Sequence, residues 1–209
     1  GIIRYLHCGY LQAKRGVLSE RLVFQVGGLA EDLKSRVILS HIGRATTKEQ
    51  QTSGKWRYYR GFNPSRELYN LDNVVLDKNV ARQISETGQL VLVEGAFDVA
   101  KCVEAGILNV VASFGARLSE TQVKKLRDIL PLLSASRVLV FYDRDRAGQC
   151  ATKEAIALLR GQDIQATAFD WKQGFIDARK ERIPITKTIQ DPCDFSVKQL
   201  HWLRKRRAV

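Results

Sequence analysis

The sequence lacks methionine altogether, even at position 1, and it has no hydrophobic run long enough to cross a bilayer. A membrane-spanning helix needs about 20 consecutive apolar residues, and the first residues, GIIRYLHCGYLQAKRG, do not contain the apolar segment of a signal peptide. The four cysteines, Cys8, Cys102, Cys150 and Cys193, have no CxxC spacing, so neither a zinc ribbon nor a disulfide framework is indicated. We therefore expect a cytoplasmic fragment of a longer protein, with reduced thiols.

Acidic residues are few relative to basic ones. The chain has 34 Lys and Arg against 22 Asp and Glu, for a net charge of +12, which favours a polyanionic partner such as nucleic acid. A basic protein of the membrane surface is the alternative, but there is no long basic amphipathic helix with a bulky apolar face, and we predict no membrane partner. Residues 1–88 hold 14 Lys and Arg against 8 Asp and Glu, residues 89–171 hold 10 of each, and residues 172–209 hold 10 against 4.

The neutral middle segment alternates short apolar runs with stretches of helical length. Strands are predicted over 90–93, 109–113, 137–142 and 164–169, and helices over 97–105, 119–130 and 147–160. Ser119 and Gln122 have the spacing of a capping box, and Gly106 and Gly161 are placed to end helices. This order predicts an α/β fold with a mainly parallel sheet and helices on both faces.

The two flanking segments have a different pattern. Strands are predicted over 21–26, 36–42 and 55–60 and a helix over 70–84, which together indicate a small basic α+β subdomain before the α/β domain. After it we predict a loop from about Lys172 to Pro192, a helix from Ser196 and a basic end. The predicted divisions are 1–88, 89–171 and 172–209.

Acidic side chains follow the predicted strands. The first strand is followed by Glu94 and, one helical turn on, by Asp98; the third is followed by Asp143 and Asp145; and Asp191 and Asp194 lie beyond the fourth. In a parallel sheet, functional groups gather where strands end at the carboxyl edge. Gly95 and Gly148 allow a tight turn and close backbone packing beside the acids.

Two carboxylates at positions i and i+2 after a buried strand repel each other unless a cation compensates them. Carboxylates without His or Cys ligands favour Mg²⁺ or Mn²⁺, and such ions orient and neutralise phosphates in phosphoryl transfer. A single Asp after a strand is more often a helix N-cap, by about two to one. The joint pattern of Glu-Gly after one strand and DxD after another favours the metal hypothesis.

These motifs carry a family resemblance. The segments VEGAFDVAKCVEAGILNVVASFGARLSETQ and VLVFYDRDRAGQCATKEAIALL resemble the Toprim domain of topoisomerases and primases, most closely that of bacterial-type (DnaG-like) primases. Upstream, RLVFQV, the Gly43-Arg44 pair and KWRYYRGFNPSRELYNL resemble the basic subdomain that precedes Toprim in those primases. The resemblance extends from about Arg21 to Asp194.

The resemblance implies a nucleotidyltransferase, a DNA-directed RNA polymerase of the primase type that makes short RNA primers for DNA replication with Mg²⁺ or Mn²⁺. The implied catalytic residues are Glu94, Asp98, Asp143 and Asp145, and the implied metal ligands are Glu94, Asp143, Asp145, Asp191 and Asp194. Arg44, Lys55, Arg57, Arg66 and Gly115 would lie along the nucleotide and DNA groove. The implied partners are single-stranded DNA template, ribonucleoside triphosphates and a replicative helicase, the last through a domain absent from this sequence.

Two positions depart from the family pattern. The chain has Asp143-Arg144-Asp145 where these primases commonly show DGD, so that a bulky cation separates the two acids. It has Asp191-Pro192-Cys193 where they commonly show DPD, with Asp194 as a substitute.

Aromatic residues are interleaved with cations between Lys55 and Phe62. Such a mixture can stack bases while neutralising phosphates, and it adds Arg60 to the predicted DNA-binding residues. A strand with buried aromatic residues and solvated cations accounts for it equally well.

Three functions compete on the sequence. Primer synthesis is the leading hypothesis, a metal-dependent Toprim nuclease shares the acidic cluster, and a non-catalytic nucleic-acid-binding module would keep only the fold. The basic stretch 43–71 favours the primase over the nuclease. A topoisomerase would need gate domains that 209 residues cannot supply.

Overall fold

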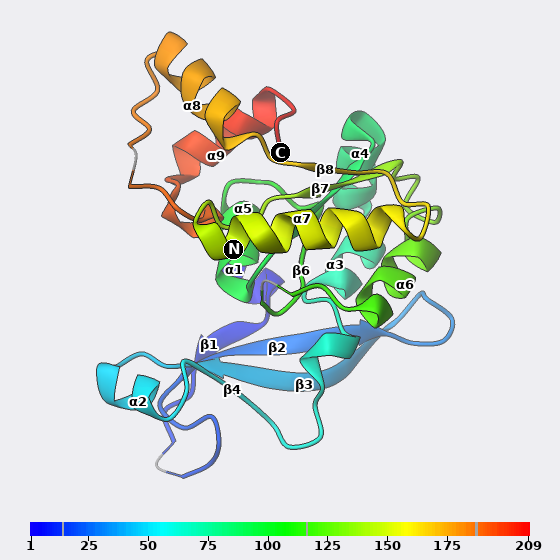
Figure 1. Cartoon of the computed structure of the whole chain (residues 1–209). Coiled ribbons are helices and arrows are strands. Elements are labelled where there is room, and N and C mark those ends of the chain that lie inside the picture. Colours follow the sequence, from blue (N-terminus) through cyan, green and yellow to red (C-terminus); the bar gives the residue numbers. More distant parts are fainter. Residues whose placement is uncertain (14, 116, 187) are drawn as a thin grey trace.

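Two four-stranded sheets organise the molecule. A computed structural model of the chain describes residues 1–13, 15–115, 117–186 and 188–209. The first sheet is antiparallel, with the order β1-β2-β3-β4, and the second is parallel, with the order β6-β5-β7-β8. Figure 1 shows the antiparallel sheet at the bottom of the molecule and the parallel sheet with its helices above it.

The antiparallel sheet consists of β1 (Cys8–Tyr10), β2 (Leu22–Leu29), β3 (Arg36–Arg44) and β4 (Trp56–Tyr58). The predicted strands over 21–26, 36–42 and 55–60 are confirmed as β2, β3 and β4. β1 and the short helices α1 (Ile2–Tyr5), α2 (Lys48–Thr52) and η1 (Pro64–Arg66) were not predicted.

The parallel sheet confirms the predicted order of strands and helices. Its strands are β5 (Gln89–Val93), β6 (Val110–Ala112), β7 (Arg137–Val140) and β8 (Ala166–Ala168), and the connecting helices are α5 (Ala96–Glu104), α6 (Glu120–Ile129) and α7 (Arg146–Arg160). Ser119 and Gln122 form the predicted capping box at the start of α6. The last strand is shorter than the predicted 164–169.

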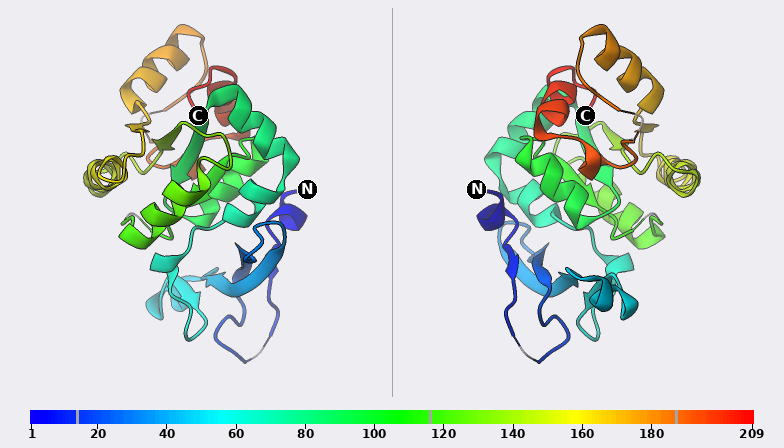
Figure 2. Two further views of the ribbon diagram at one scale, coloured as in Figure 1. Left: turned by 90° about the vertical axis from the view of Figure 1, so that its right-hand side faces the viewer. Right: turned by 90° about the vertical axis from the view of Figure 1, so that its left-hand side faces the viewer.

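Helices cover both faces of this sheet, as predicted. The side chains of β5 alternate, so that Val91 and Val93 pack on one side and Leu90 and Leu92 on the other, all four fully buried. On the first side they meet α5, α9 (Val197–Lys205) and the antiparallel sheet. On the second side they meet α3 (Leu71–Leu76), α4 (Lys78–Thr87), α6 and α7. Figure 2 shows these layers from two sides.

The linker between the two sheets also pairs with the parallel sheet. Tyr69 and Ala112 exchange main-chain hydrogen bonds of 2.9 and 3.1 Å in an isolated antiparallel bridge. The next residue, Asn70, is buried, adopts a left-handed conformation at φ 70°, and donates from Nδ2 to the Val110 carbonyl at 2.8 Å. One hydrophobic cluster has buried members from Leu6 to Val209, in all three predicted segments, so the divisions at 88 and 171 stay a prediction.

Two predicted elements need correction. The helix predicted over 70–84 is two helices, α3 and α4, because Asp77 adopts an extended conformation and caps α4 through the Asn79 N–H. The predicted loop from Lys172 to Pro192 was wrong, since α8 (Trp171–Lys180) occupies its first half and the 3₁₀ turn η2 (Pro192–Asp194) its end. Asp170 caps α8 by accepting from the Gln173 N–H at 2.8 Å.

An aromatic cluster holds α8 on the parallel sheet. Trp171 stacks on Phe195 with ring centroids 5.7 Å apart, and both rings contact Phe141, which follows β7. At the other end of α8, Arg206 forms ion pairs with Asp177 and Glu181. In the described part of the chain no helix is long and apolar enough to span a membrane.

Candidate active site

A cavity of about 280 Å³ lies between the carboxyl edge of the parallel sheet and the antiparallel sheet. Four of the predicted acids line it: Glu94, Asp98, Asp143 and Asp191. Glu94 directly follows β5, and Asp98 is in the first turn of α5. Asp143 lies three residues after the end of β7, and Asp191 precedes η2. The fold therefore brings acids from three separate segments of the chain to one place.

Strand register explains why Glu94 and Asp143 meet. β5 and β7 are parallel neighbours with Leu92 opposite Val140, so the residues after both strands leave the sheet together. The Asp143 N–H donates to Glu94 Oε1 at 3.2 Å, and the Gly115 N–H donates to the Glu94 carbonyl at 2.8 Å. Gly115, at φ 138°, thus lies beside the acids as the resemblance implied.

Gly148 allows α7 to begin directly behind Asp143. A Cβ atom at Gly148 would lie 2.2 Å from the Asp143 carbonyl oxygen and 2.8 Å from the Asp143 Cβ. Nonbonded atoms do not approach so closely, so only glycine fits this position without a backbone shift. The prediction that Gly148 permits close backbone packing is confirmed.

Basic and aromatic side chains from the antiparallel sheet form the opposite wall. Arg44 on β3 and Lys55 before β4 both line the acidic cavity. The Arg44 guanidinium lies 5.3 Å from the Trp56 ring centroid and 5.1 Å from that of Phe97, in cation–π contact with both rings. Because these rings hold Arg44 in place, the cavity presents a fixed positive charge opposite its acids.

The remaining predicted acids have local structural roles. Asp145 caps α7, accepting from the Gly148 N–H at 2.7 Å, and it does not line the cavity. Asp191 and Asp194 cap η2 reciprocally: Asp191 Oδ1 accepts from the Asp194 N–H at 2.8 Å, and Asp194 Oδ2 accepts from the Asp191 N–H at 3.4 Å. Asp194 Oδ2 also accepts from the Gln190 N–H at 2.8 Å. Of this pair only Asp191 also reaches the cavity.

The two departures from the family pattern are placed differently from each other. Arg144 does not intrude between the acids, because its guanidinium lies 5.0 Å from the Phe175 ring centroid on α8. Cys193, in contrast, lines the cavity, where Asp194 had been predicted as the substitute. The side chain that takes the place of the third DPD residue is thus a half-buried thiol.

The acids of the cavity share an excess of negative charge. Burial, followed by the charges of Glu94, Asp98, Asp191 and Asp145, raises the pKa of Asp143 to about 8. Burial, with Asp191 next in size, raises the pKa of Asp98 to about 7, although the Gly95 N–H partly opposes the shift. Burial also raises the pKa of Glu94 and of Asp191. These carboxylates favour a cation in the cavity, because it would replace the protons they otherwise retain.

The carboxylates of the acidic cavity are suitable ligands for a hard divalent ion. Their oxygens are the ligands that Mg²⁺ and Mn²⁺ prefer, and Mg²⁺ is commonly held by one or two carboxylates plus substrate phosphates. Within the described ranges, no three His, Cys, Asp or Glu side chains are grouped to hold one ion. The described acids therefore leave most of the coordination of an ion to phosphate oxygens and water.

The pKa values of Asp143 and Asp98 exceed those of the same residues in an unfolded chain. The stability of the metal-free protein should therefore fall as the pH rises. Between about pH 4 and 8 the folded state keeps protons on Asp143 and Asp98 that the unfolded state has released. We expect Asp143→Asn, which removes the charge, to be more stable than wild type at pH 8 and closer to it at pH 5. Urea unfolding in a chelator tests this; equal wild-type stability at the two pH values would contradict it.

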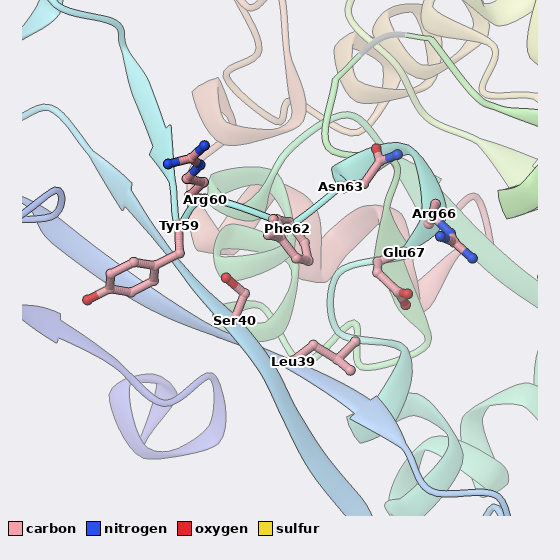
Figure 3. A pocket seen from close by; sticks show the side chains of 9 residues that line it. Leu39, Ser40, Tyr59, Arg60, Phe62, Asn63, Arg66 and Glu67 are labelled. Carbon is pink, nitrogen blue, oxygen red and sulfur yellow. The ribbon is translucent and has the colours of Figure 1, made fainter.

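A second cavity, of about 540 Å³, adjoins the antiparallel sheet and contains two of the other predicted DNA-binding residues. Figure 3 shows Arg60 and Arg66 on either side of Phe62, with Tyr59 and Ser40 nearby. Phe62 stacks on Tyr58, which lines the acidic cavity, with ring centroids 5.9 Å apart. We call this the Arg60/Arg66 cavity. The stacked pair of Phe62 and Tyr58 connects it to the acidic cavity.

The basic and aromatic stretch contains both buried and exposed side chains, and its predicted binding of bases and phosphates stays a prediction. Trp56, Tyr58 and Phe62 pack against the hydrophobic core, whereas Tyr59 and Arg60 are exposed. Arg57, predicted to bind DNA, lies on the other face of β4, where its Nε donates to the Ser53 carbonyl at 3.4 Å. Of the predicted cations, Arg57 alone lines neither cavity.

Some residues of the acidic cavity were not predicted. Phe97 and Phe114 line it, and Phe97 anchors Arg44. Phe97 lies between Gly95 and Asp98, but its aromatic side chain gave no sign of facing the acids. Cys193 was noted as a departure, without a place in the site.

Comparison with known proteins gives the class of this fold and site. Residues 88–170 match the family model of the Toprim domain. The chain therefore carries a Toprim domain. The two sheets confirm the predicted α/β fold with a smaller α+β part before it.

The individual proteins that resemble this chain belong to a narrower group than the Toprim domain as a whole. The chain is 34% identical over 154 residues to the DNA primase of Synechococcus elongatus (73% of this chain, 20% of that protein) and 36% identical over 104 residues to that of Lactococcus lactis (50% and 15%). The crystal structure of the Aquifex aeolicus primase, zinc-binding and RNA polymerase domains, has a TM-score of 0.70 at 21% identity over 99% of this chain and 51% of that one. The RNA polymerase domain of Mycobacterium tuberculosis primase DnaG gives 0.66 at 17% over 98% and 70%.

The chain is thus related to bacterial DNA primases and has the fold of their DnaG catalytic cores. It spans about a fifth or less of the length of these two curated relatives.

Proposed function

We propose that the chain is the catalytic core of a DNA primase, which synthesises short RNA primers on a single-stranded DNA template from ribonucleoside triphosphates. The observation that carries the proposal is the acidic cavity, in which Toprim acids face Arg44 and Lys55 of the antiparallel sheet. A DnaG primase catalytic domain of this fold has been solved bound to single-stranded DNA, at a TM-score of 0.52.

The chemistry assigns a different task to each group. Mg²⁺ or Mn²⁺, held by Asp143 with Glu94 or Asp191, would neutralise the phosphates and align the attacking hydroxyl with the leaving pyrophosphate. Arg44, which the Trp56 and Phe97 rings hold, would contact the triphosphate of the incoming nucleotide. Asp145, at the N-cap of α7, adds negative charge behind this site.

The template would lie across the Arg60/Arg66 cavity, where Phe62 and Tyr59 offer ring faces to bases and the two arginines neutralise phosphates. Replacing Arg60 and Arg66 by alanine should weaken binding of single-stranded DNA and lower the salt slope by about 1.4. Arg57→Ala, which removes a cation from the opposite face of β4, is the matched control and should change the slope less. Fluorescence anisotropy at several salt concentrations measures both, and equal effects would place the DNA elsewhere.

Primer extension separates a primase from a nuclease. With single-stranded template, Mn²⁺, ribonucleotides and an annealed RNA primer, we expect extension that is lost in Asp145→Asn and strongly reduced in Arg66→Ala. Asparagine retains the α7 cap, so the loss in Asp145→Asn would come from the charge and not from an uncapped helix. Template cleavage without extension, dependent on Asp145 but indifferent to Arg66, would replace the primase by the Toprim nuclease.

A further inference from the structure

A third cavity lies on the outer side of the Toprim domain, against α8. It has a volume of about 700 Å³ and is lined by Arg144, the α8 side chains of Lys172, Phe175, Ile176, Arg179 and Lys180, and residues 183–185. We call it the α8 groove. Figures 1 and 2 place α8 and the antiparallel sheet at opposite ends of the molecule, so the groove and the Arg60/Arg66 cavity lie far apart.

The helix presents this groove as one regular face. The lining positions 172, 175, 176, 179 and 180 have the i, i+3, i+4, i+7, i+8 spacing of a single helical stripe. Such a stripe normally packs on a core, but of these five positions only Phe175 does so, beside Trp171 and Ala178 of the same helix. Its side chains at 172, 176, 179 and 180 are exposed.

Charge is segregated around α8. Asp177 on α8 and Glu181, the residue after it, both pair with Arg206 at the end of α9. In the groove, none of the described lining residues is acidic, and Lys172, Arg179 and Lys180 form no ion pair with the described part of the chain. The groove thus combines a cationic rim with an apolar floor that includes the Phe175 ring.

The groove begins at the turn that carries Asp143 and Asp145. Arg144, which lies over the Phe175 ring, stands between Asp143 and Asp145 in the sequence. Its main-chain N–H donates to the Gln190 carbonyl at 2.6 Å, which ties this turn to the segment that leads to Asp191. A polyanion that occupies the groove would therefore reach the edge of the acidic cavity.

We propose that the α8 groove binds the unpaired template strand on the far side of the acids from the Arg60/Arg66 cavity. This proposal rests on the proposed function. Single-stranded DNA fits the groove because it offers both phosphates for the cations and apolar base surface for Ile176 and Ile183, which line the groove together with Phe175. The RNA product is base-paired to the template, so the template is the strand that has unpaired bases beyond the acids.

Binding of mixed-sequence single-stranded DNA of about 20 nucleotides tests the proposal. Lys172→Ala/Arg179→Ala/Lys180→Ala should lower the affinity about tenfold and the salt slope by about 2, as three lost phosphate contacts require. The matched control, Lys78→Ala/Lys124→Ala/Lys153→Ala, removes three exposed cations from α4, α6 and α7 and should change the slope by less than about 1. Circular dichroism checks that both variants fold.

A crosslink locates the strand independently of charge. A benzophenone amino acid in place of Ile176, which is 39% exposed, should crosslink to the DNA on irradiation. The same group in place of Leu132, which is 62% exposed and lies between α6 and β7, should not. Crosslinking at both positions would indicate collision and would overturn the proposal.

The remaining outcomes are distinguishable. If the groove variant binds DNA like its control while Arg60→Ala/Arg66→Ala loses affinity, the groove proposal is wrong and the template site stands. If polyglutamate binds wild type as tightly as DNA does and loses affinity equally in the groove variant, the groove is a site for acidic protein. If the groove variant loses DNA affinity but wild type cleaves template and never extends a primer, the groove binds a nuclease substrate.

Discussion

Replacing Asp143 by asparagine should reduce primer extension by more than about 100-fold and weaken Mn²⁺ binding in the same preparation. Loss of a side chain that only supports a metal ligand commonly lowers activity by 10- to 100-fold, so loss of a ligand should have a larger effect. Asp143 lies at the centre of the acids: Glu94, Asp98, Asp191 and Asp145 all act on its pKa. Among the described residues its carboxylate accepts no hydrogen bond, so it is available to an ion.

Asp128→Asn is the matched control, since it removes an exposed carboxylate on α6 that pairs with its neighbour Arg127. It should leave both measurements unchanged. Titration of Mn²⁺ by electron paramagnetic resonance gives the affinity without reference to activity. Equal Mn²⁺ affinity in wild type and Asp143→Asn would contradict the assignment of Asp143 as a ligand.

Gly148→Ala should destabilise the folded chain by about 2–3 kcal/mol, the upper part of the range for overpacking, and should impair metal binding as well. The added Cβ would meet the main-chain carbonyl of Asp143, which cannot rotate away as a side chain would. The conflict can be relieved only by moving α7 or the turn that carries Asp143, and either movement changes the position of the acid relative to Glu94.

Gly9→Ala is the control for this substitution, because no atom lies within 4 Å of a Cβ at that position. Its effect on the free energy of unfolding in urea should be within about 0.5 kcal/mol. A Gly148→Ala variant with wild-type stability and Mn²⁺ affinity would show that the turn can shift without consequence.

The parallel sheet could be predicted from the sequence because its local signals agree with its tertiary packing. β5 is a continuous apolar run buried on both faces, and Ser119 and Gln122 give the start of α6. α8 was missed because it presents Lys172, Ile176, Arg179 and Lys180 to solvent, so its apolar periodicity is incomplete. Its N-cap at Asp170 was the signal that could have revealed it.

The site was predictable as far as strand ends determine it. Glu94 and Asp143 meet because β5 and β7 are neighbours, which the chain order indicates. Whether an acid caps a helix or binds an ion depends on where its carboxylate points. The spacing of residues in the sequence does not predict that orientation. Asp145 and Asp194 accept from main-chain N–H groups of their own turns, Asp143 faces the cavity, and Asp191 does both.

The bridge between Tyr69 and Ala112 protects the parallel sheet from self-association. β6 is an outer strand, and an outer strand with free main-chain groups can template the addition of a strand from another molecule. Here the Tyr69 backbone pairs with Ala112, and the Asn70 side chain occupies the Val110 carbonyl. At the opposite border, β8 has only three residues. Partial unfolding that releases the linker at Tyr69 and Asn70 would expose the apolar edge of β6, and aggregation would then begin at that edge.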